Sequence, residues 1–220
     1  MVNMRIDIIG SLVGLDGASF YLLIYSFSGW DEVMREVDLY SGVEQYLNLT
    51  FSRLISPKSK ISYPFAAITA QSGGTGSGKW SRPDLALVHL WKHKFVPNFN
   101  LDLYGFEVKT EQGCDVTGVH EALAHKRNVH YSYLTWHYPS CDFETPHFKT
   151  ILENCSAYGV GLISFSSDGD ASSYQRHLKA RRSDAEADAV DDFIETRFDA
   201  NQKALLLNRL GDPVGGPSCG

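Results

Sequence analysis

The spacing of apolar residues along the chain predicts helices that alternate with strands. Between 31 and 55 the apolar side chains recur at steps of three and four residues, which is typical of a helix with one buried face. The Ser41-Gly42 pair divides this stretch into a short helix and a longer one that would begin at Ser41. Three strands are then predicted, at 65–70, 84–91 and 101–109.

The second half of the chain continues this alternation and ends in helices alone. In order, the predicted elements are a helix at 116–128 with Thr117 as its cap, a strand at 130–136, a helix at 148–158 that ends at Gly159, a strand at 160–165, a helix at 184–197 capped by Ser183 and a helix up to 211 capped by Asp199. This order favours an α/β fold with a mixed central sheet and helices on both of its faces.

The N-terminal stretch from 8 to 30 is poor in charge but does not match a membrane segment. It contains Asp16 and several glycines, and it has neither a basic start nor a clear cleavage site. The Asp16-Gly17 pair instead predicts a turn between two strands. We therefore expect no membrane association.

Composition narrows the class of protein. The 220 residues are 43% hydrophobic and 12% aromatic, which predicts one folded core. The net charge of −6 argues against a broadly basic nucleic-acid binder, although local patches set the field at a site. Four cysteines without a C-x-x-C spacing argue against a zinc knuckle or a disulfide scaffold and favour a cytoplasmic protein.

A glycine-rich stretch at 73–80, GGTGSGKW, nearly matches the phosphate-binding loop G-x-x-x-x-G-K-[ST]. Trp80 stands where that loop needs a hydroxyl for Mg²⁺, and a strand rather than a helix is predicted after it. We interpret the stretch as a loop that leads to Asp84. A nucleotide-binding protein is the alternative, and loss of nucleotide binding on substitution of Lys79 would support it.

Charged residues stand at the ends of two predicted strands. Pro83-Asp84 opens one strand, and Glu107-Val108-Lys109 closes the next. Because strand side chains alternate with a period of two, Glu107 and Lys109 share one face of the sheet. Charges in a buried strand are costly unless they are paired. These residues therefore predict either a structural ion pair or a site in which two carboxylates bind Mg²⁺ beside a lysine.

The spacing of Pro83-Asp84 and Glu107-Val108-Lys109 resembles the PD-(D/E)xK nuclease superfamily, which includes many restriction endonucleases and Holliday-junction resolvases. The resemblance covers about residues 41–166. The family often places a glutamate on its first core helix, and Glu44 is the candidate here. Many relatives carry a glutamine on the helix after the catalytic strand, whereas this chain offers Glu121, His125 or Lys126.

The resemblance implies a restriction endonuclease-like α/β fold, with a mixed central sheet flanked by helices. Strands within 1–40 and helices within 171–212 would be additions to this core, inside one domain of residues 1–220. The implied activity is metal-dependent hydrolysis of phosphodiester bonds, with DNA as the expected substrate and a restriction or defence setting. Such enzymes often act as dimers, so a homodimer or a partner subunit is implied. Whether the substrate is DNA or RNA, and whether cleavage is internal, stays open.

The resemblance also implies residue roles. Asp84 and Glu107, with the carbonyl of Val108, would bind Mg²⁺ or Mn²⁺, and Glu44 would act on the same or a second ion through water. Lys109 would orient the attacking water or help to deprotonate it, and would balance charge in the transition state.

Basic side chains near this region could contact phosphates. They are Lys126, Arg127, Arg176, Lys179, Arg181 and Arg182. For the run that begins at Arg176, the competing interpretation is a solvated helix face. A second alternative concerns the whole chain: a non-catalytic nucleic-acid-binding or interaction module on the same fold, in which Lys109 is a structural ion-pair partner. Metal binding at Asp84 and Glu107 would distinguish the two.

Overall fold

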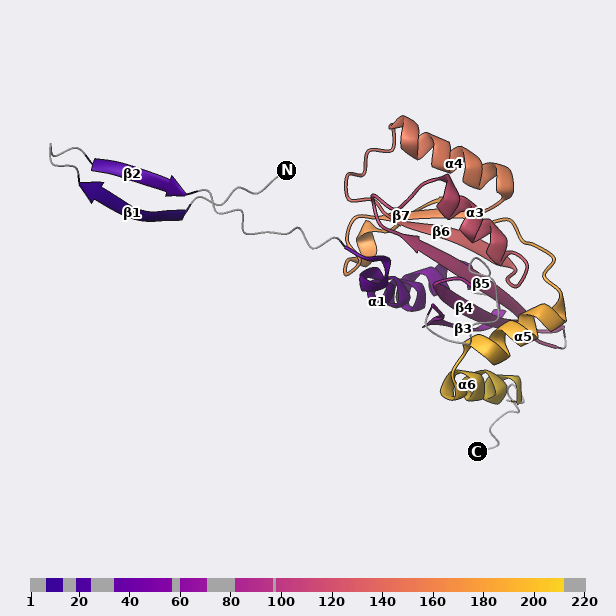
Figure 1. Cartoon of the computed structure of the whole chain (residues 1–220). Coiled ribbons are helices and arrows are strands. Elements are labelled where there is room, and N and C mark those ends of the chain that lie inside the picture. Colours follow the sequence, from indigo (N-terminus) through magenta and orange to yellow (C-terminus); the bar gives the residue numbers. More distant parts are fainter. Residues whose placement is uncertain are drawn as a thin grey trace. The chain divides into compact units, whose positions relative to one another are not determined.

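The computed structural model describes residues 7–13, 19–24, 34–56, 60–70, 82–96 and 98–211 (Figure 1). Its contacts divide the chain into two units, Met1–Met34 and Arg35–Gly220. The sequence instead predicts one domain with a core that begins at 41. The glycine-rich stretch at 73–80 lies outside the described residues, so its interpretation as a loop stays a prediction.

The first unit contains a pair of strands. Strand β1 (Asp7–Val13) and strand β2 (Ser19–Ile24) run antiparallel, with Val13 opposite Ser19. This confirms the strand pair predicted around Asp16-Gly17, although the turn itself lies outside the described residues. Across the described part of the chain, no helix is both long and apolar enough to cross a membrane.

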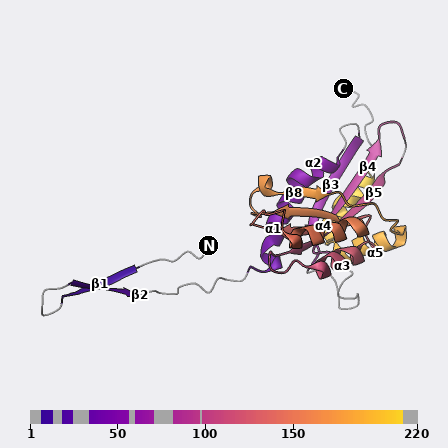
Figure 2. The same ribbon diagram turned by 90° about the horizontal axis from the view of Figure 1, so that it is seen from above.

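The second unit is built on a six-stranded mixed sheet (Figure 1, Figure 2). Its strands, in spatial order, are β3 (Lys60–Ile68), β4 (Leu85–His93), β5 (Asn100–Lys109), β6 (Tyr131–His137), β7 (Gly161–Phe165) and β8 (Gln175–Leu178). The first three form an antiparallel meander, β6 and β7 run parallel to β5, and β8 returns antiparallel to β7. The predicted α/β class with a mixed sheet is therefore present.

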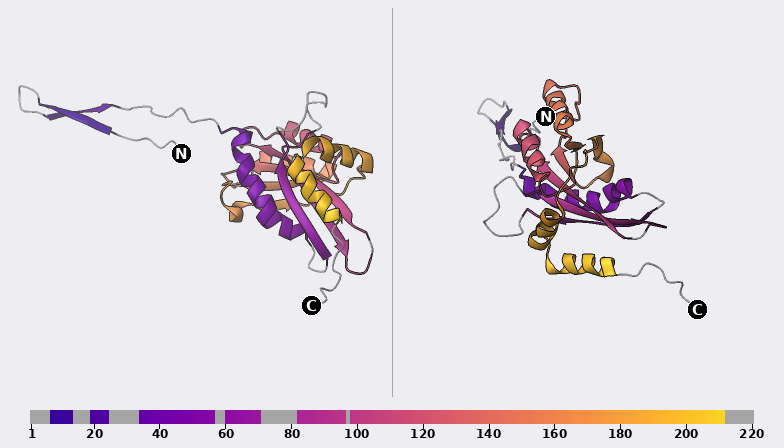
Figure 3. Two further views of the ribbon diagram at one scale, coloured as in Figure 1. Left: turned by 90° about the horizontal axis from the view of Figure 1, so that it is seen from below. Right: turned by 90° about the vertical axis from the view of Figure 1, so that its right-hand side faces the viewer.

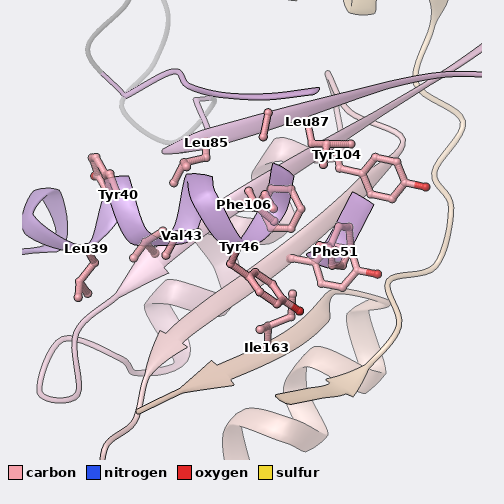
Figure 4. Packing of buried hydrophobic residues seen from close by; sticks show 14 of the residues in the cluster. Leu39, Tyr40, Val43, Tyr46, Phe51, Leu85, Leu87, Tyr104, Phe106 and Ile163 are labelled. Carbon is pink, nitrogen blue, oxygen red and sulfur yellow. The ribbon is translucent and has the colours of Figure 1, made fainter. Parts of the chain in front are cut away.

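Helices cover both faces of this sheet. They are α1 (Glu36–Tyr46), the π-helical turn η1 (Leu47–Phe51), α2 (Ser52–Ile55), α3 (Val116–His125), α4 (Pro146–Tyr158), the 3₁₀ turn η2 (Ala171–Ser173), α5 (Ala187–Arg197) and α6 (Ala200–Gly211). On one face, α1 and η1 pack on the sheet through a cluster that includes Val43, Phe51 and Phe106 (Figure 4). On the other face, α3 and α4 cover β6 and β7, while α5 and α6 cover β3 to β5 (Figure 3). Because both faces are covered, the first six residues of β4 are all buried, which places its charged neighbours in a low-dielectric setting.

The first helix is continuous where the sequence predicts a break. Helix α1 passes through Ser41 and Gly42 and continues into η1 and α2, so the predicted division was wrong. Gly42 is required by packing rather than by a turn. A Cβ at Gly42 would lie 2.6 Å from the Cβ of Asp168 and 2.7 Å from its carbonyl oxygen.

We expect Gly42→Ala to destabilise the fold by about 1–3 kcal/mol, because the added methyl overlaps the backbone of Asp168. An alanine in an open helix position would instead stabilise by up to about 1 kcal/mol. Urea unfolding measures the difference. Gly169→Ala is the control, since a Cβ there meets nothing within 4 Å. A Gly42→Ala protein as stable as the wild type would contradict the close approach.

The helix caps differ in part from those predicted. Asp115, not Thr117, caps α3, and its carboxylate accepts from the backbone N–H of Thr117 and of Gly118. Ser183 does not cap α5, because its hydroxyl donates to the carbonyl oxygens of 129 and 130. The predicted end of α4 at Gly159, with a φ of 67°, and the predicted cap Asp199 of α6 are confirmed.

Candidate active site

Asp84 is held at the start of β4 by contacts from both sides. Leu85, the next residue, pairs with Phe106 of β5, which brings Asp84 beside the end of that strand. The backbone N–H of Val108 donates to Oδ2 of Asp84 at 2.9 Å, and the hydroxyl of Tyr40 donates to Oδ1 at 2.6 Å. Burial raises the pKa of Asp84, while these two hydrogen bonds oppose the rise. The carboxylate is thus fixed in position by β5 and by α1.

Glu107 and Lys109 lie at the end of β5, on the face that α3 covers. Both are buried, with 7% and 8% of their surfaces exposed. Lys109 Nζ donates to Oε1 of Glu107 at 2.7 Å. Close packing of α3 fixes the lysine, since a Cβ at Gly118 would lie 3.3 Å from the Lys109 side chain. The sequence-predicted pair therefore shares one face and is in direct contact.

Lys109 is surrounded by carboxylates from three elements. Besides Glu107, its Nζ lies 3.0 Å from Oε1 of Glu36 on α1 and 2.8 Å from Oε2 of Glu121 on α3. Burial alone would lower the pKa of Lys109, but the three carboxylates together raise it. The ammonium form of Lys109 is therefore strongly favoured in this site. It acts in this site as a fixed positive charge.

Of the three residues proposed in place of the family's glutamine, two lie in the candidate site, and both come from helix α3. Glu121 and His125 are four residues apart, so they project from the same face of α3. His125 Nε2 lies 3.3 Å from Oε2 of Glu107, whereas its buried Nδ1 has no hydrogen-bond partner among the described residues. Lys126 is directed elsewhere, and its Nζ donates to the carbonyl oxygen of Tyr158.

The contribution of α1 differs in part from the prediction. Glu36 and Tyr40 contact Lys109 and Asp84, and neither was singled out in the sequence. Glu44 follows at the same four-residue spacing and so lies on the same side of the helix. It is partly buried, which raises its pKa, and a hydrogen bond from the backbone of Ile68 opposes the rise. The predicted role of Glu44 stays a prediction.

Electrostatics couple the two carboxylates of the signature. Burial raises the pKa of Glu107, and the negative charge of Asp84 raises it further, while Lys109 lowers it. Each charge thus disfavours the other, and a positive partner relieves the repulsion. Lys109 is the partner in this structure.

The buried imidazole of His125 makes the stability depend on pH. Burial, and to a smaller extent Lys109, lowers its pKa from 6.5 to about 3. The stabilisation is therefore complete above about pH 6.5 and is lost as the pH falls from there towards 3, because the unfolded chain takes up the proton first.

We expect His125→Gln to reduce the decrease in unfolding free energy on acidification. The residue contributes up to about 1.4 kcal/mol per pH unit to that decrease below its unfolded pKa. Denaturant unfolding at several pH values between about 7 and 4 measures the slope. His120→Gln is the matched control, because His120 is an exposed residue of the same helix. Equal slopes for the wild type and His125→Gln would contradict this assignment.

A cavity of about 460 Å³ lies beside the candidate site. Its lining residues come from α1, the end of β3, and the junction of α5 and α6: Val37, Tyr40, Ser41, Ile68, Arg197, Phe198, Asp199 and Gln202. Tyr40 links the cavity to the site, since its hydroxyl is bonded to Asp84. Arg197 is buried in this wall, and burial together with nearby Arg82 lowers its pKa. The cavity wall therefore carries both a guanidinium and a carboxylate, those of Arg197 and Asp199.

The six basic residues proposed as phosphate contacts do not form one surface strip. The residues from Arg176 onward lie on and after the strand β8, so the interpretation as a helix face was wrong. Arg181 donates to the carbonyl oxygens of Ser156 and Ala157 and so satisfies the end of α4. Arg182 lies 3.4 Å from Asp102. Arg127 is exposed just after α3, and the remaining two, Arg176 and Lys179, line a separate pocket.

The donor chemistry of Asp84 and Glu107 fits a hard divalent cation. Carboxylate oxygens are the donors that Mg²⁺ and Mn²⁺ prefer, and the negative charge of Asp84, which raises the pKa of Glu107, would be offset by a cation between them. Water commonly completes the shell. Among the described residues, no group of three or more His, Cys, Asp or Glu is arranged to hold a metal ion. The backbone N–H of Val108 donates to Asp84. That the carbonyl oxygen of Val108 binds the metal ion stays a prediction.

The comparisons with known proteins add little to this geometry. No family model and no curated protein matches the chain. Among solved structures, a protein of unknown function from Silicibacter pomeroyi is similar, with 15% identity and a TM-score of 0.40 over 86% of this chain and 99% of the other. That similarity supports no statement about function. The interpretation therefore rests on the residues of the site.

Proposed function

We propose that the chain is a metal-dependent nuclease of the PD-(D/E)xK type, with DNA as the expected substrate. The observation that carries the proposal is the convergence of Asp84, Glu107 and Lys109 at the ends of two adjacent strands. A helix bearing glutamates precedes these strands, and a helix and a parallel strand follow them, in the order that the family resemblance leads one to expect.

Each residue has a role that its surroundings support. Asp84 and Glu107 would hold Mg²⁺ or Mn²⁺, which when bound supplies Lewis acidity to the scissile phosphate. Tyr40 and the Val108 N–H keep Asp84 oriented. Lys109, held in its ammonium form by three carboxylates that occupy its three N–H donors, would offset the charge that develops on the phosphate. Its raised pKa favours this charge-balancing role over that of a general base.

The cavity beside Tyr40 supports a phosphate-bearing substrate. Arg197 lines it, and Arg82 lies close enough to lower the pKa of Arg197. A guanidinium has five N–H donors, and charge-assisted hydrogen bonds from it to phosphate oxygens are strong. Nucleic acid that enters from this side would bring a backbone phosphate towards Asp84.

A second candidate is a non-catalytic nucleic-acid-binding or interaction module. The observation that favours it is the set of three carboxylates around Lys109, which is the arrangement of a self-sufficient ion-pair network. In that case the lysine is structural and the carboxylates have no need of a metal ion.

Cleavage and metal binding separate the two candidates. Plasmid, linear duplex, single-stranded DNA and RNA would be incubated with Mg²⁺, Mn²⁺ or chelator, and Mn²⁺ binding would be followed by calorimetry. Metal-dependent cleavage supports the nuclease and identifies its substrate. Absence of both cleavage and Mn²⁺ binding supports the non-catalytic module. A nuclease that needs a partner subunit would bind Mn²⁺ without cleaving.

A further inference from the structure

A second pocket lies at the opposite end of the first helix from the candidate site. It has a volume of about 180 Å³ and is formed by α2, by β5 and β6, and by β8 with the residues after it. The lining residues are Leu54, Ile55, Tyr104, Tyr131, Tyr133, Arg176, Lys179 and Ala180. From Glu36 to Ile55 the helix is about 28 Å long, at about 1.5 Å per residue. The pocket is therefore distinct from the site around Asp84.

Three tyrosines form one wall of the pocket. Tyr104 and Tyr131 are register partners on β5 and β6, and their rings stack with centroids 4.6 Å apart and planes inclined by 13°. Figure 4 shows Tyr104 at the margin of the buried cluster, with its hydroxyl directed away from the labelled core residues. Tyr133 lies on the same strand face as Tyr131, two residues further along β6. Rigid, stacked rings thus present phenolic hydroxyls to a small cavity.

The hydrogen bonding of these hydroxyls favours donation into the pocket. Burial raises the pKa of Tyr133, and hydrogen bonds from the Ala180 backbone and from Arg176 oppose the rise. Burial likewise raises the pKa of Tyr131, and a hydrogen bond from Arg182 opposes it. A phenolic oxygen that already accepts hydrogen bonds has its own O–H left to donate. Each of these tyrosines can therefore present a proton to an acceptor.

Two cations complete the pocket. Arg176 packs over the ring of Phe51, with its guanidinium carbon 6.0 Å from the ring centre, and Lys179 is exposed at the rim. Asp102 is the acidic group that acts on Tyr104 and Tyr131, and it is already engaged by Arg182 and by the indole N–H of Trp91. The balance of charge in the pocket is therefore positive.

We propose that this tyrosine–cation pocket binds a phosphate-type oxyanion, carried either by inorganic phosphate or by a nucleotide. A tetrahedral phosphate offers several acceptor oxygens and no obligatory donor. Phenolic hydroxyls, a guanidinium and an ammonium offer the complementary donors, and charge-assisted hydrogen bonds of this kind are the strong ones. Phosphate binding in this pocket requires no cleavage activity, so it can be tested independently of the proposed nuclease.

The test is a calorimetric titration of the full chain, without added metal, with inorganic phosphate, thymidine 5′-monophosphate and thymidine. We expect saturable binding of the two phosphates and none of thymidine. Arg176→Gln and Lys179→Gln should each weaken binding by about tenfold or more, as expected on loss of one charge-assisted hydrogen bond. Tyr131→Phe, which keeps the stacked ring and removes only the hydroxyl, should also weaken it. Circular dichroism establishes that each variant is folded.

Two controls locate the binding. Lys149→Gln removes an exposed lysine of α4 and should leave the affinity unchanged. Asp84→Asn alters the candidate active site and should also leave it unchanged. Tighter binding of the nucleotide than of inorganic phosphate identifies a nucleotide as the carrier, and equal affinity identifies free phosphate. Three results would each overturn the proposal: no saturable binding of phosphate, wild-type affinity in both Arg176→Gln and Lys179→Gln, or binding of thymidine.

Discussion

The Asp84→Asn protein is expected to lose metal-dependent cleavage of DNA by at least about a hundredfold, the usual cost of removing one preorganised electrostatic group. Asparagine keeps the shape of the side chain and can still accept the hydrogen bond from Tyr40. It lacks the negative charge that would hold a divalent cation next to Glu107. The loss should appear in kcat and in the affinity for Mn²⁺ together, because one charge serves both.

The matched control for this experiment is Asp192→Asn. Asp192 is an exposed aspartate of α5, and it is not part of the candidate site. Cleavage by the control should equal that of the wild type. Full cleavage by a folded Asp84→Asn protein would refute the assigned role of Asp84. Cleavage that persists in the presence of chelator would refute the dependence on a metal ion.

The second large effect concerns stability. We expect Lys109→Met to lower the unfolding free energy by about 3–5 kcal/mol, the usual cost of removing one partner from a buried ion pair. Methionine fills a similar volume, so the loss reports charge rather than a cavity. Three carboxylates, those of Glu36, Glu107 and Glu121, lose their shared partner. Urea unfolding, followed by circular dichroism, measures the change.

Two further variants test the electrostatic origin of this loss. Lys149→Met, at an exposed ion pair with Glu144, should leave the stability close to that of the wild type. Adding Glu121→Gln to Lys109→Met should restore part of the loss, because it removes one of the carboxylates left unpaired. If Mn²⁺ restores the stability of Lys109→Met, the carboxylates bind a cation. A Lys109→Met protein as stable as the wild type would show that the network contributes no net stability.

The sequence predicted the part of the site that lies on strands. The period of two put Glu107 and Lys109 on one face, and the Pro83-Asp84 strand start put a carboxylate beside them, because neighbouring strands leave little freedom of register. Glu121 and His125 were also among the candidates, because the family resemblance implies a functional side chain on the helix after the catalytic strand. Lys126, the third candidate on that helix, donates to the Tyr158 carbonyl instead. In the structure Glu121 contacts Lys109, and His125 contacts Glu107.

The sequence did not predict the contribution of α1. The Ser41-Gly42 pair suggested a break in the helix, which assigned Glu36 and Glu44 to different helices. In the continuous helix, Glu36, Tyr40 and Glu44 follow one another at steps of four residues. Only tertiary packing explains the glycine, because Asp168 lies more than a hundred residues away in the chain and occupies the space of a side chain. The i, i+4, i+8 spacing of Glu36, Tyr40 and Glu44 was the available signal.

The strand β8 was missed for a related reason. Its four residues include only one strongly apolar side chain, Leu178. The alternation of apolar and polar residues that identifies a strand is therefore absent from this segment. The strand is defined by pairing with β7, which the sequence does not display. The mistaken helix face for Arg176 followed from that omission, and so did the failure to see Tyr133 and Arg176 as neighbours.

The cover that α5 and α6 provide for β3 to β5 determines where the chain can be shortened. Phe193 and Phe198 bury apolar residues of the central strands, among them Val88 and Leu103. A fragment that ended at 166 would open this face to water and would turn β7 into an unprotected edge strand. The helices near the C-terminus are thus part of the folding unit rather than an appendage to it, and a minimal fragment of this protein has to retain them.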